Sequence, residues 1–129
     1  MQMFQLVEDV EQYPTFLSAC RDARVISRDA GITVAELVLE KAGLEQRFTT
    51  RNINRPGESI DLELERGPFS FLQGRWTFES LAEDSCRVSF VLEFEMKRQL
   101  MQKLIASMVA ETANRLVDAI CQRAHQLYG

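Results

Sequence analysis

The sequence has few of the residues that build metal or disulfide sites. It contains three cysteines and one histidine among 129 residues, and no Cys-x-x-Cys, Cys-x-x-His or His-x-x-x-His spacing occurs. An odd number of scattered cysteines argues against a disulfide framework and against structural zinc. We therefore expect no metal site, and reduced, mostly buried thiols at Cys20, Cys86 and Cys121, as in a cytoplasmic protein.

Long apolar runs and an excess of basic charge are also missing. No stretch approaches the roughly 18 apolar residues of a membrane span, and no signal-peptide pattern opens the chain. We therefore expect no integral membrane segment. The net charge of -4 argues against a general nucleic-acid binder, although it leaves room for a local basic patch. With 46% apolar and 26% charged residues, residues 1–129 are expected to form a single domain.

A long amphipathic helix is predicted at the C-terminus, from Lys97 to Tyr128. Apolar residues recur there at steps of three and four, the spacing of one helical face. A helix with one apolar stripe needs a broad surface to cover, so we expect it to pack on a sheet. The stripe consists of Leu100, Met101, Leu104, Ile105, Met108, Val109, Ala113, Leu116, Val117 and Ile120.

The N-terminal residues from Met1 to about Leu17 predict a helix followed by a shorter helical turn. Phe4 and Val7 belong to its apolar face. Tyr13 precedes Pro14, and a residue before proline disfavours helical geometry. We therefore expect the helix to break at Tyr13.

Between these helices the apolar period changes from helical to two, which indicates strands. Gly74 inside one of them predicts a bulge or strong coiling of a curved sheet. The order of helix, strands and long helix predicts an α+β fold, in which a curved antiparallel sheet wraps around the C-terminal helix. The six expected strands are Ala23–Arg28, Ile32–Lys41, Leu44–Asn54, Glu58–Arg66, Ser70–Leu81 and Cys86–Met96.

The hairpin closed by Arg55, Pro56 and Gly57 allows its register to be predicted from charge. One register places the alternating apolar side chains on one face and opposite charges across from each other on the other face. The expected cross-strand pairs are Asn54–Glu58, Phe48–Leu64, Arg51–Asp61 and Arg47–Glu65.

Four sequence blocks, in the same order along the chain, resemble the START-like polyketide-cyclase/coenzyme-Q-binding family. The resemblance covers essentially the whole chain and is closer to the branch of bacterial ribosome association toxins than to the mitochondrial branch. It implies a helix-grip fold of the START/Bet v 1 type, with a hydrophobic cavity between the sheet and the C-terminal helix. The blocks are DVEQYPTFLSAC (Asp9–Cys20), KAGLEQRFTTRN (Lys41–Asn52), GPFSFLQGRWTFESL (Gly67–Leu81) and CRVSFVLEFEM (Cys86–Met96).

The chain departs from this family at its start. Family members begin with a strand before the first helix, whereas this chain begins inside that helix. The first strand is therefore expected to be missing, which leaves the strand Cys86–Met96 with an unpaired edge. A shortened N-terminus is the favoured explanation, and a homodimer that covers the edge is the alternative.

The cavity wall is expected to consist of aromatic residues, methionine and leucine, which adapt to irregular apolar ligands. The same residues also suit an ordinary core. Ser89, Cys86 and His125 form no nucleophile–base pattern, so the sequence identifies no catalytic residues and leaves enzyme activity unsupported. The expected ligand-binding residues are Phe48, Trp76, Phe78, Phe90, Phe94, Met101, Leu104 and Met108, with Met96 beside them.

Three functions follow from the resemblance. The leading hypothesis is non-enzymatic binding of a hydrophobic ligand, ubiquinone or a related polyprenyl lipid, with no other cofactor. The second is binding to the large ribosomal subunit and inhibition of translation, with basic residues as phosphate contacts. The third, a polyketide cyclase or aromatase, rests on fold analogy alone. The basic residues are Arg21, Arg24, Arg28, Arg47, Arg51, Arg55, Lys97, Arg98 and Lys103.

Overall fold

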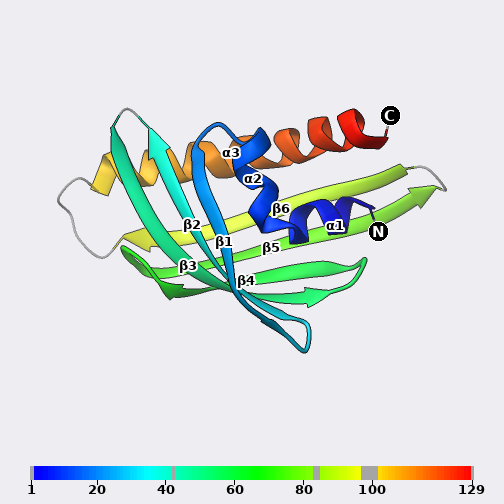
Figure 1. Ribbon diagram of the computed structural model, residues 1–129, viewed down its shortest axis with the longest axis horizontal. Coiled ribbons are helices and arrows are strands. Elements are labelled where there is room, and N and C mark those ends of the chain that lie inside the picture. Colours follow the sequence, from blue (N-terminus) through cyan, green and yellow to red (C-terminus); the bar gives the residue numbers. More distant parts are fainter. Residues whose placement is uncertain (1, 42, 83–84, 97–101, 129) are drawn as a thin grey trace.

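The computed structural model describes residues 2–41, 43–82, 85–96 and 102–128. Short helical segments open the described chain, six strands follow, and a long helix ends it, as Figure 1 shows. The elements are α1 (Gln2–Glu8), the 3₁₀ helix η1 (Val10–Gln12), α2 (Tyr13–Phe16), β1 (Cys20–Asp29), β2 (Ile32–Lys41), β3 (Leu44–Arg55), β4 (Ser59–Arg66), β5 (Phe69–Ala82), β6 (Ser85–Met96) and α3 (Gln102–Tyr128).

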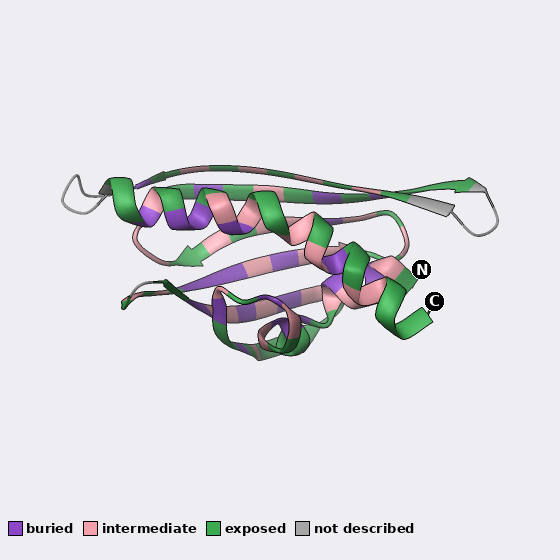
Figure 2. Cartoon of the chain, turned by 90° about the horizontal axis from the view of Figure 1, so that it is seen from above, coloured by how far each residue is buried: buried purple, intermediate pink, exposed green. Residues whose placement is uncertain are grey.

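The strands form one antiparallel sheet in the order β1-β2-β3-β4-β5-β6, so each strand pairs with its neighbour in the sequence. The sheet curves around α3 (Figure 1). Along α3, buried residues such as Ile105, Met108 and Ile120 alternate with exposed ones (Figure 2). This pattern is the apolar stripe expected from the sequence, and the α+β helix-grip architecture is confirmed.

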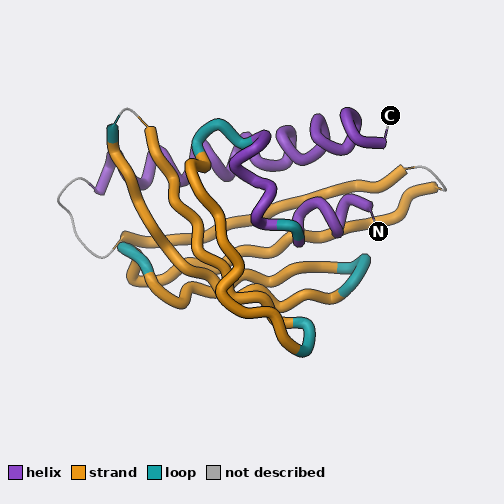
Figure 3. Tube along the Cα trace, viewed as in Figure 1, coloured by secondary structure: helices purple, strands orange, loops and turns teal. Residues whose placement is uncertain are grey.

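The helical segments at the two ends of the chain support each other. α1 packs against α3, while η1 and α2 pack against β1. Figure 3 shows α1 beside the C-terminal part of α3, and the two described ends of the chain lie near one another. None of the described helices is both long and apolar enough to cross a membrane.

The predicted helix break at Tyr13 is wrong. Tyr13 is helical, with φ -53° and ψ -41°, and the chain leaves helical geometry at Asp9 instead, with φ -80° and ψ 68°. Pro14 lies in the first turn of α2, where a missing N–H costs nothing because it would have no partner within the helix. Proline therefore starts the second helix rather than ending the first.

The predicted register of the β3–β4 hairpin is wrong by two residues. Asn54 lies opposite Ile60 rather than Glu58. The N–H of Glu58 donates to the Arg55 carbonyl at 2.9 Å, and Gly57 has φ 75°. Proline followed by a glycine of positive φ makes a type II turn with Arg55 at its first position. The turn chemistry therefore set the register, and a shift of two residues left the faces unchanged.

The ion pairs on the outer face follow the observed register. Arg51 pairs with Glu63 at 3.3 Å, and Asp61 pairs with both Arg55 and Arg75 at 2.6 Å. The predicted Arg51–Asp61 pair is therefore wrong.

Arg47 points outward, as expected, but its partner also differs from the prediction. It pairs with Glu36 of β2 at 2.9 Å instead of Glu65. The predicted Phe48–Leu64 pair is also wrong. Phe48 lies opposite Leu37 of β2, and Leu64 lies opposite Thr50.

Gly74 causes no bulge, contrary to the bulge alternative. It pairs regularly with Leu62 on β4 and Leu92 on β6. A Cβ atom at this position would lie 3.2 Å from a methyl carbon of each leucine. Close packing of these two side chains is therefore the reason for a glycine here.

Within the described residues, β6 pairs only with β5, so it is an edge of the sheet, as the sequence predicted. A homodimer through this edge remains a prediction. The thiols differ from expectation, because Cys20 is buried but Cys121 is exposed. The side chain of Cys86 lies outside the described residues.

Candidate ligand cavity

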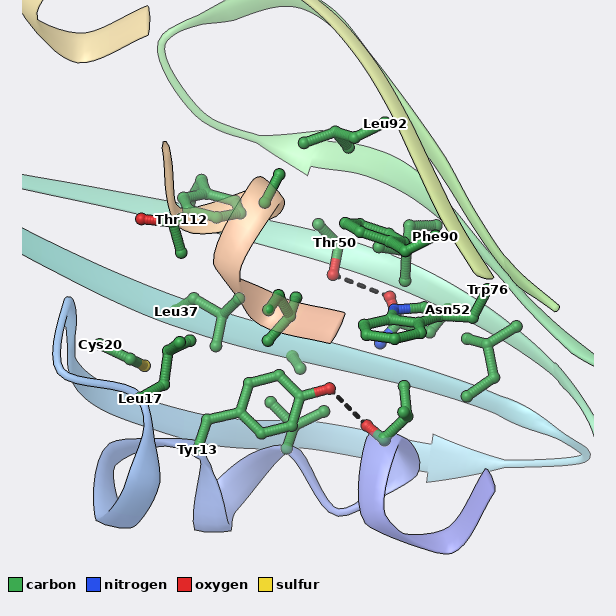
Figure 4. A pocket seen from close by; sticks show the side chains of 18 of the residues that line it. Tyr13, Leu17, Cys20, Leu37, Thr50, Asn52, Trp76, Phe90, Leu92 and Thr112 are labelled. Atoms are coloured by element: carbon green, nitrogen blue, oxygen red, sulfur yellow. Dashed lines mark hydrogen bonds between the residues drawn. The ribbon is translucent and has the colours of Figure 1, made fainter. Parts of the chain in front are cut away.

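A cavity of about 80 Å³ lies between the sheet, the N-terminal helical segments and α3. Figure 4 shows it from close by. Its wall is mostly apolar because the inward residues of the strands alternate with outward polar ones, so that only one face of each strand borders it. Val7 of α1, Tyr13 of α2 and Leu17, which follows α2, close one side, and Val109 and Leu116 of α3 close another.

Three of the sequence-predicted residues line this cavity, namely Phe48, Trp76 and Phe90. Trp76 of β5 and Phe90 of β6 are direct cross-strand partners. Their rings stack with centroids 4.5 Å apart and planes 22° apart. The register of two neighbouring strands thus builds a rigid aromatic wall. Their role in ligand binding remains a prediction.

The other predicted residues of the strands do not border the cavity. The ring of Phe78 stacks on Trp76 with centroids 6.3 Å apart, and the ring of Phe94 lies edge to face with Phe69, with centroids 5.7 Å apart. Both pack against the core around the cavity, and buried Met96 also belongs to this core.

Two predicted residues of the long helix lie at a different surface feature. Leu104 and Met108 border a shallow groove outside the cavity, next to Leu44 of β3. Leu104 is 62% exposed, whereas Met108 is buried. Met101 lies outside the described residues.

Polar residues of the cavity wall were missed by the sequence analysis. Thr33 of β2 and Thr50, Asn52 and Asn54 of β3 all line it. The Thr50 hydroxyl donates to Oδ1 of Asn52 at 2.8 Å, and Nδ2 of Asn54 donates to the Thr33 hydroxyl at 2.9 Å. A period of two places the three β3 residues on the face of Phe48, so the alternation itself could have identified them.

Two ionisable groups on the wall are held neutral. The Tyr13 hydroxyl donates to the Val7 carbonyl at 2.6 Å, and burial raises the pKa of Tyr13 far above its ordinary value. Burial also raises the pKa of the Cys20 thiol to about 11. Neither group changes its protonation state near neutral pH, so neither is suited to acid–base catalysis there.

Charge is nearly absent from the described residues that line the cavity. Glu8 is the one charged residue among those that line it. Over the described part of the chain, no three Cys, His, Asp or Glu side chains come together as metal ligands. The arrangement is therefore suited to holding an uncharged apolar molecule.

A groove lies on the surface between α3 and the segment that joins α2 to β1. Leu17 and Thr112 border both the cavity and this groove. At the edge of the groove, Lys41 of β2 forms an ion pair with Glu111 of α3. Leu17 and Thr112 are both buried and lie between the groove and the cavity.

Comparison with known proteins supports this picture of the fold. The profile of the polyketide cyclase/dehydrase and lipid transport family matches residues 1–121. The chain belongs to this family. The resemblance predicted from the four sequence blocks is thereby confirmed.

Two curated relatives represent different branches. The ribosome association toxin RatA of Pseudomonas aeruginosa is 43% identical over 127 residues, which cover 98% of this chain and 88% of the relative. The mitochondrial coenzyme Q-binding protein COQ10 homolog B of Xenopus laevis is 28% identical over 132 residues, covering 99% of this chain and 54% of the relative.

Solved structures agree on the fold. An 18 kDa protein of Caulobacter crescentus has a TM-score of 0.72 at 34% identity, covering 99% of this chain and 89% of that one. The Zhui aromatase/cyclase of a Streptomyces species has a TM-score of 0.85 at 16% identity, covering 96% and 85%. At that identity the likeness to the aromatase/cyclase shows the fold alone.

Proposed function

We propose that the protein acts as a ribosome association toxin, which binds the large ribosomal subunit and inhibits translation. The observation that carries this proposal is the 43% identity to the Pseudomonas aeruginosa toxin across 98% of the chain. The same relative is covered over 88% of its length, so the similarity extends beyond a shared core.

The distribution of ion pairs narrows the search for a ribosome contact. Most arginines of the outer sheet face are already paired with acidic side chains, as Arg47 and Arg51 are. Phosphate binding by these residues would first require breaking their existing pairs. The outer sheet face is therefore a poor candidate for binding ribosomal RNA.

Arg66 and Lys103 differ from those arginines. Both are exposed, and neither forms an ion pair with a described residue. Arg66 ends β4 and Lys103 lies in the first turn of α3, at the same end of the molecule (Figure 1). We propose this end as a phosphate-contacting surface.

Sedimentation of the protein with isolated ribosomal subunits tests both the binding to the large subunit and the role of Arg66 and Lys103. We expect the protein to migrate with the large subunit at low salt and to dissociate as salt rises, because each released counterion contributes to binding. The double variant Arg66→Gln/Lys103→Gln should bind more weakly and with a shallower salt dependence. Arg51→Gln, which removes an already paired charge, is the matched control. Absence of the wild-type protein from the large-subunit fraction would refute the proposal.

A second candidate function is binding of a hydrophobic ligand, favoured by the apolar cavity and by the similarity to the coenzyme Q-binding relative. The cavity of about 80 Å³ is smaller than the roughly 150 Å³ cavity that holds benzene in another protein. A polyprenyl lipid therefore requires the cavity to widen, with its tail in the groove beside α3. No nucleophile–base pair lies among the described lining residues, so the geometry favours binding over cyclase chemistry.

Native mass spectrometry of the protein purified from its own cells, followed by lipid extraction, tests this second function. A bound ligand at a hundredfold excess over its Kd should raise the free energy of unfolding by about 2.7 kcal/mol. A protein that carries no extractable lipid, and that gains no thermal stability from added quinones, would rule the function out.

A further inference from the structure

The two edges of the sheet are protected to different degrees. At the β1 edge, η1 and α2 pack against the strand, and the Val25 N–H donates to a carboxylate oxygen of Glu11 at 3.2 Å. The register of β1 on β2 also shifts at two points. Covering segments and bulges are the devices that keep an edge strand from pairing with another chain. The β1 edge is therefore protected against a further strand.

The β6 edge lacks such protection along residues 88–96. This stretch contains no proline, glycine or lysine, and its pairing with β5 runs without a register shift from Val88 to Glu95. Although α3 packs against β6, no main-chain hydrogen bond joins residues 88–96 to a described element other than β5. Figure 1 shows β6 beyond β5 at this side of the sheet. Alternate residues of an edge strand direct their N–H and C=O groups away from the paired neighbour, so another strand can bind there.

Apolar side chains next to the β6 edge are incompletely covered. On the inner face, Trp76 of β5 is buried, whereas its cross-strand partner Phe90 is only partly buried. Leu72 and Phe94 differ in the same way. On the outer face, Val91 is 63% exposed. A strand added beside β6 would cover apolar surface on both faces, which favours its addition.

The outer face of β6 is complementary to itself when two copies of the strand run in opposite directions. In an antiparallel pair of identical strands, residues equally far from the two-fold axis face each other. An axis at Val91 sets Arg87 of each copy opposite Glu95 of the other and pairs the two exposed valines. Opposite charges and apolar side chains across from each other both stabilise strand pairing. The exposed residues of this face are, in chain order, Arg87, Ser89, Val91, Glu93 and Glu95.

Neighbouring registers match less well. An axis at Glu93 sets two carboxylates opposite each other, which is unfavourable. An axis at Ser89 sets Arg87 opposite Val91. An axis at Phe90 gives Arg87 a carboxylate, that of Glu93, but leaves Val91 opposite Ser89. The axis at Val91 therefore satisfies both the charges and the exposed apolar side chain.

We propose that the protein forms a homodimer in which the β6 strands of two copies pair antiparallel about a two-fold axis at Val91. One sheet then runs through both copies. Arg87 of each copy faces Glu95 of the other, and its five N–H groups can serve this carboxylate together with that of Glu79, which lies 3.9 Å away on β5. The homodimer rests on neither candidate function.

Sedimentation equilibrium of the wild-type protein and of charge variants tests the dimer. We expect the wild type to associate from monomer to dimer as its concentration rises. Arg87→Glu and Glu95→Arg should each weaken the dimer about tenfold, because a symmetric interface contains the reversed pair twice. An equimolar mixture of these two variants should form a heterodimer at least as stable as the wild-type dimer, since every reversed charge then faces its opposite. Arg28→Glu, which changes an exposed residue of β1, is the matched control and should leave the dimer unchanged.

Disulfide cross-linking tests the register. In a Cys86→Ser/Cys121→Ser background, Val91→Cys places two thiols on the axis, where Cα atoms are about 4.5–5.5 Å apart, a separation that a disulfide spans. We expect a cross-linked dimer on a non-reducing gel after mild oxidation. Ser89→Cys is the matched control from the same face, because its two copies lie four residues apart along the strands, about 13 Å, and should cross-link slowly.

Three results would overturn the proposal. The first is a wild-type protein that stays monomeric at every concentration. The second is a dimer that both single charge variants leave intact, because such a dimer does not use the β6 edge in this register. The third is cross-linking of Ser89→Cys as fast as that of Val91→Cys. Misfolding of a variant cannot imitate the expected result, because two misfolded variants would not recover association when mixed.

Discussion

The Tyr13 hydroxyl donates a buried hydrogen bond of 2.6 Å to the main-chain carbonyl of Val7. This bond connects α2 to α1 across the break at Asp9, and both residues line the cavity. Because Tyr13 also contacts Phe16 edge to face at 5.8 Å, its ring and its hydroxyl together determine how the N-terminal segment closes one side of the cavity.

Removal of this hydroxyl should destabilise the protein. Tyr13→Phe keeps the ring but leaves the Val7 carbonyl without its donor, and we expect a loss of about 1–2 kcal/mol in the free energy of unfolding. Urea denaturation measures the loss. Tyr128→Phe is the control, because Tyr128 is exposed at the end of α3. Equal stability of the two variants would show that the buried bond contributes nothing.

A side chain at Gly67 should disturb the cavity wall. A Cβ atom there would lie 2.8 Å from Cβ of Phe48 and 3.2 Å from Cδ2 of Phe69. The Cβ of Phe48 moves only with its backbone, so we expect Gly67→Ala to cost about 1–3 kcal/mol, as overpacking does. At Gly74 the two nearest atoms, each 3.2 Å away, are methyl carbons at the ends of Leu62 and Leu92, so Gly74→Ala, measured in the same urea assay, should cost less.

The paired Asp61 should contribute to stability only above acid pH. Hydrogen bonds from Arg75 and then Arg55 lower the pKa of Asp61. Its contribution is therefore present above the unfolded value, about 3.9, and is lost as pH falls through the lower folded value. Asp61→Asn should cost at most about 1 kcal/mol at pH 7, since the arginines are exposed.

Urea denaturation of wild type and Asp61→Asn at several pH values measures this difference. The two proteins should converge in stability as the medium becomes acidic. Glu58→Gln is a suitable control, because Glu58 belongs to the same hairpin and its side chain forms no ion pair with a described residue. A difference between wild type and Asp61→Asn that does not change with pH would contradict the role of the carboxylate charge.

Cys20 should be inert at neutral pH. Burial raises the pKa of its thiol to about 11, above the value of about 8.5 for a free cysteine. In a Cys86→Ser background, a thiol reagent at pH 7.5 should modify exposed Cys121 rapidly and Cys20 only after unfolding. Rapid modification of Cys20 in the folded Cys121→Ser protein would contradict its burial.

The raised pKa of Cys20 also predicts a loss of stability at high pH. The unfolded chain loses its thiol proton first, so the contribution of Cys20 is fully present below about pH 8.5 and disappears as pH rises through about 11. The raised pKa of Tyr13 acts in the same direction. Urea midpoints should fall over this range, and less steeply for Cys20→Ala.

The sequence alone was enough to predict the strands and their faces. β2 runs from Ile32 to Lys41 as predicted, and Leu72, Trp76 and Phe78 of β5 are buried while Gln73 and Arg75 are exposed. These features depend on a period of two, a local property of consecutive residues. The apolar stripe of α3 was predictable for the same reason, from a period near 3.6.

Which inward residues border the cavity was decided by the tertiary structure. Trp76 and Phe78 share one face of β5, yet Trp76 lines the cavity and Phe78 packs against Trp76 and Phe4 of α1 instead. The difference arises from where α3 and the N-terminal helices cross the sheet, which no local pattern specifies. The register of β3 and β4 was likewise decided by the type II turn at Gly57. The alternation of apolar and polar residues could not identify this register, because a shift of two residues keeps every side chain on the same face of the sheet.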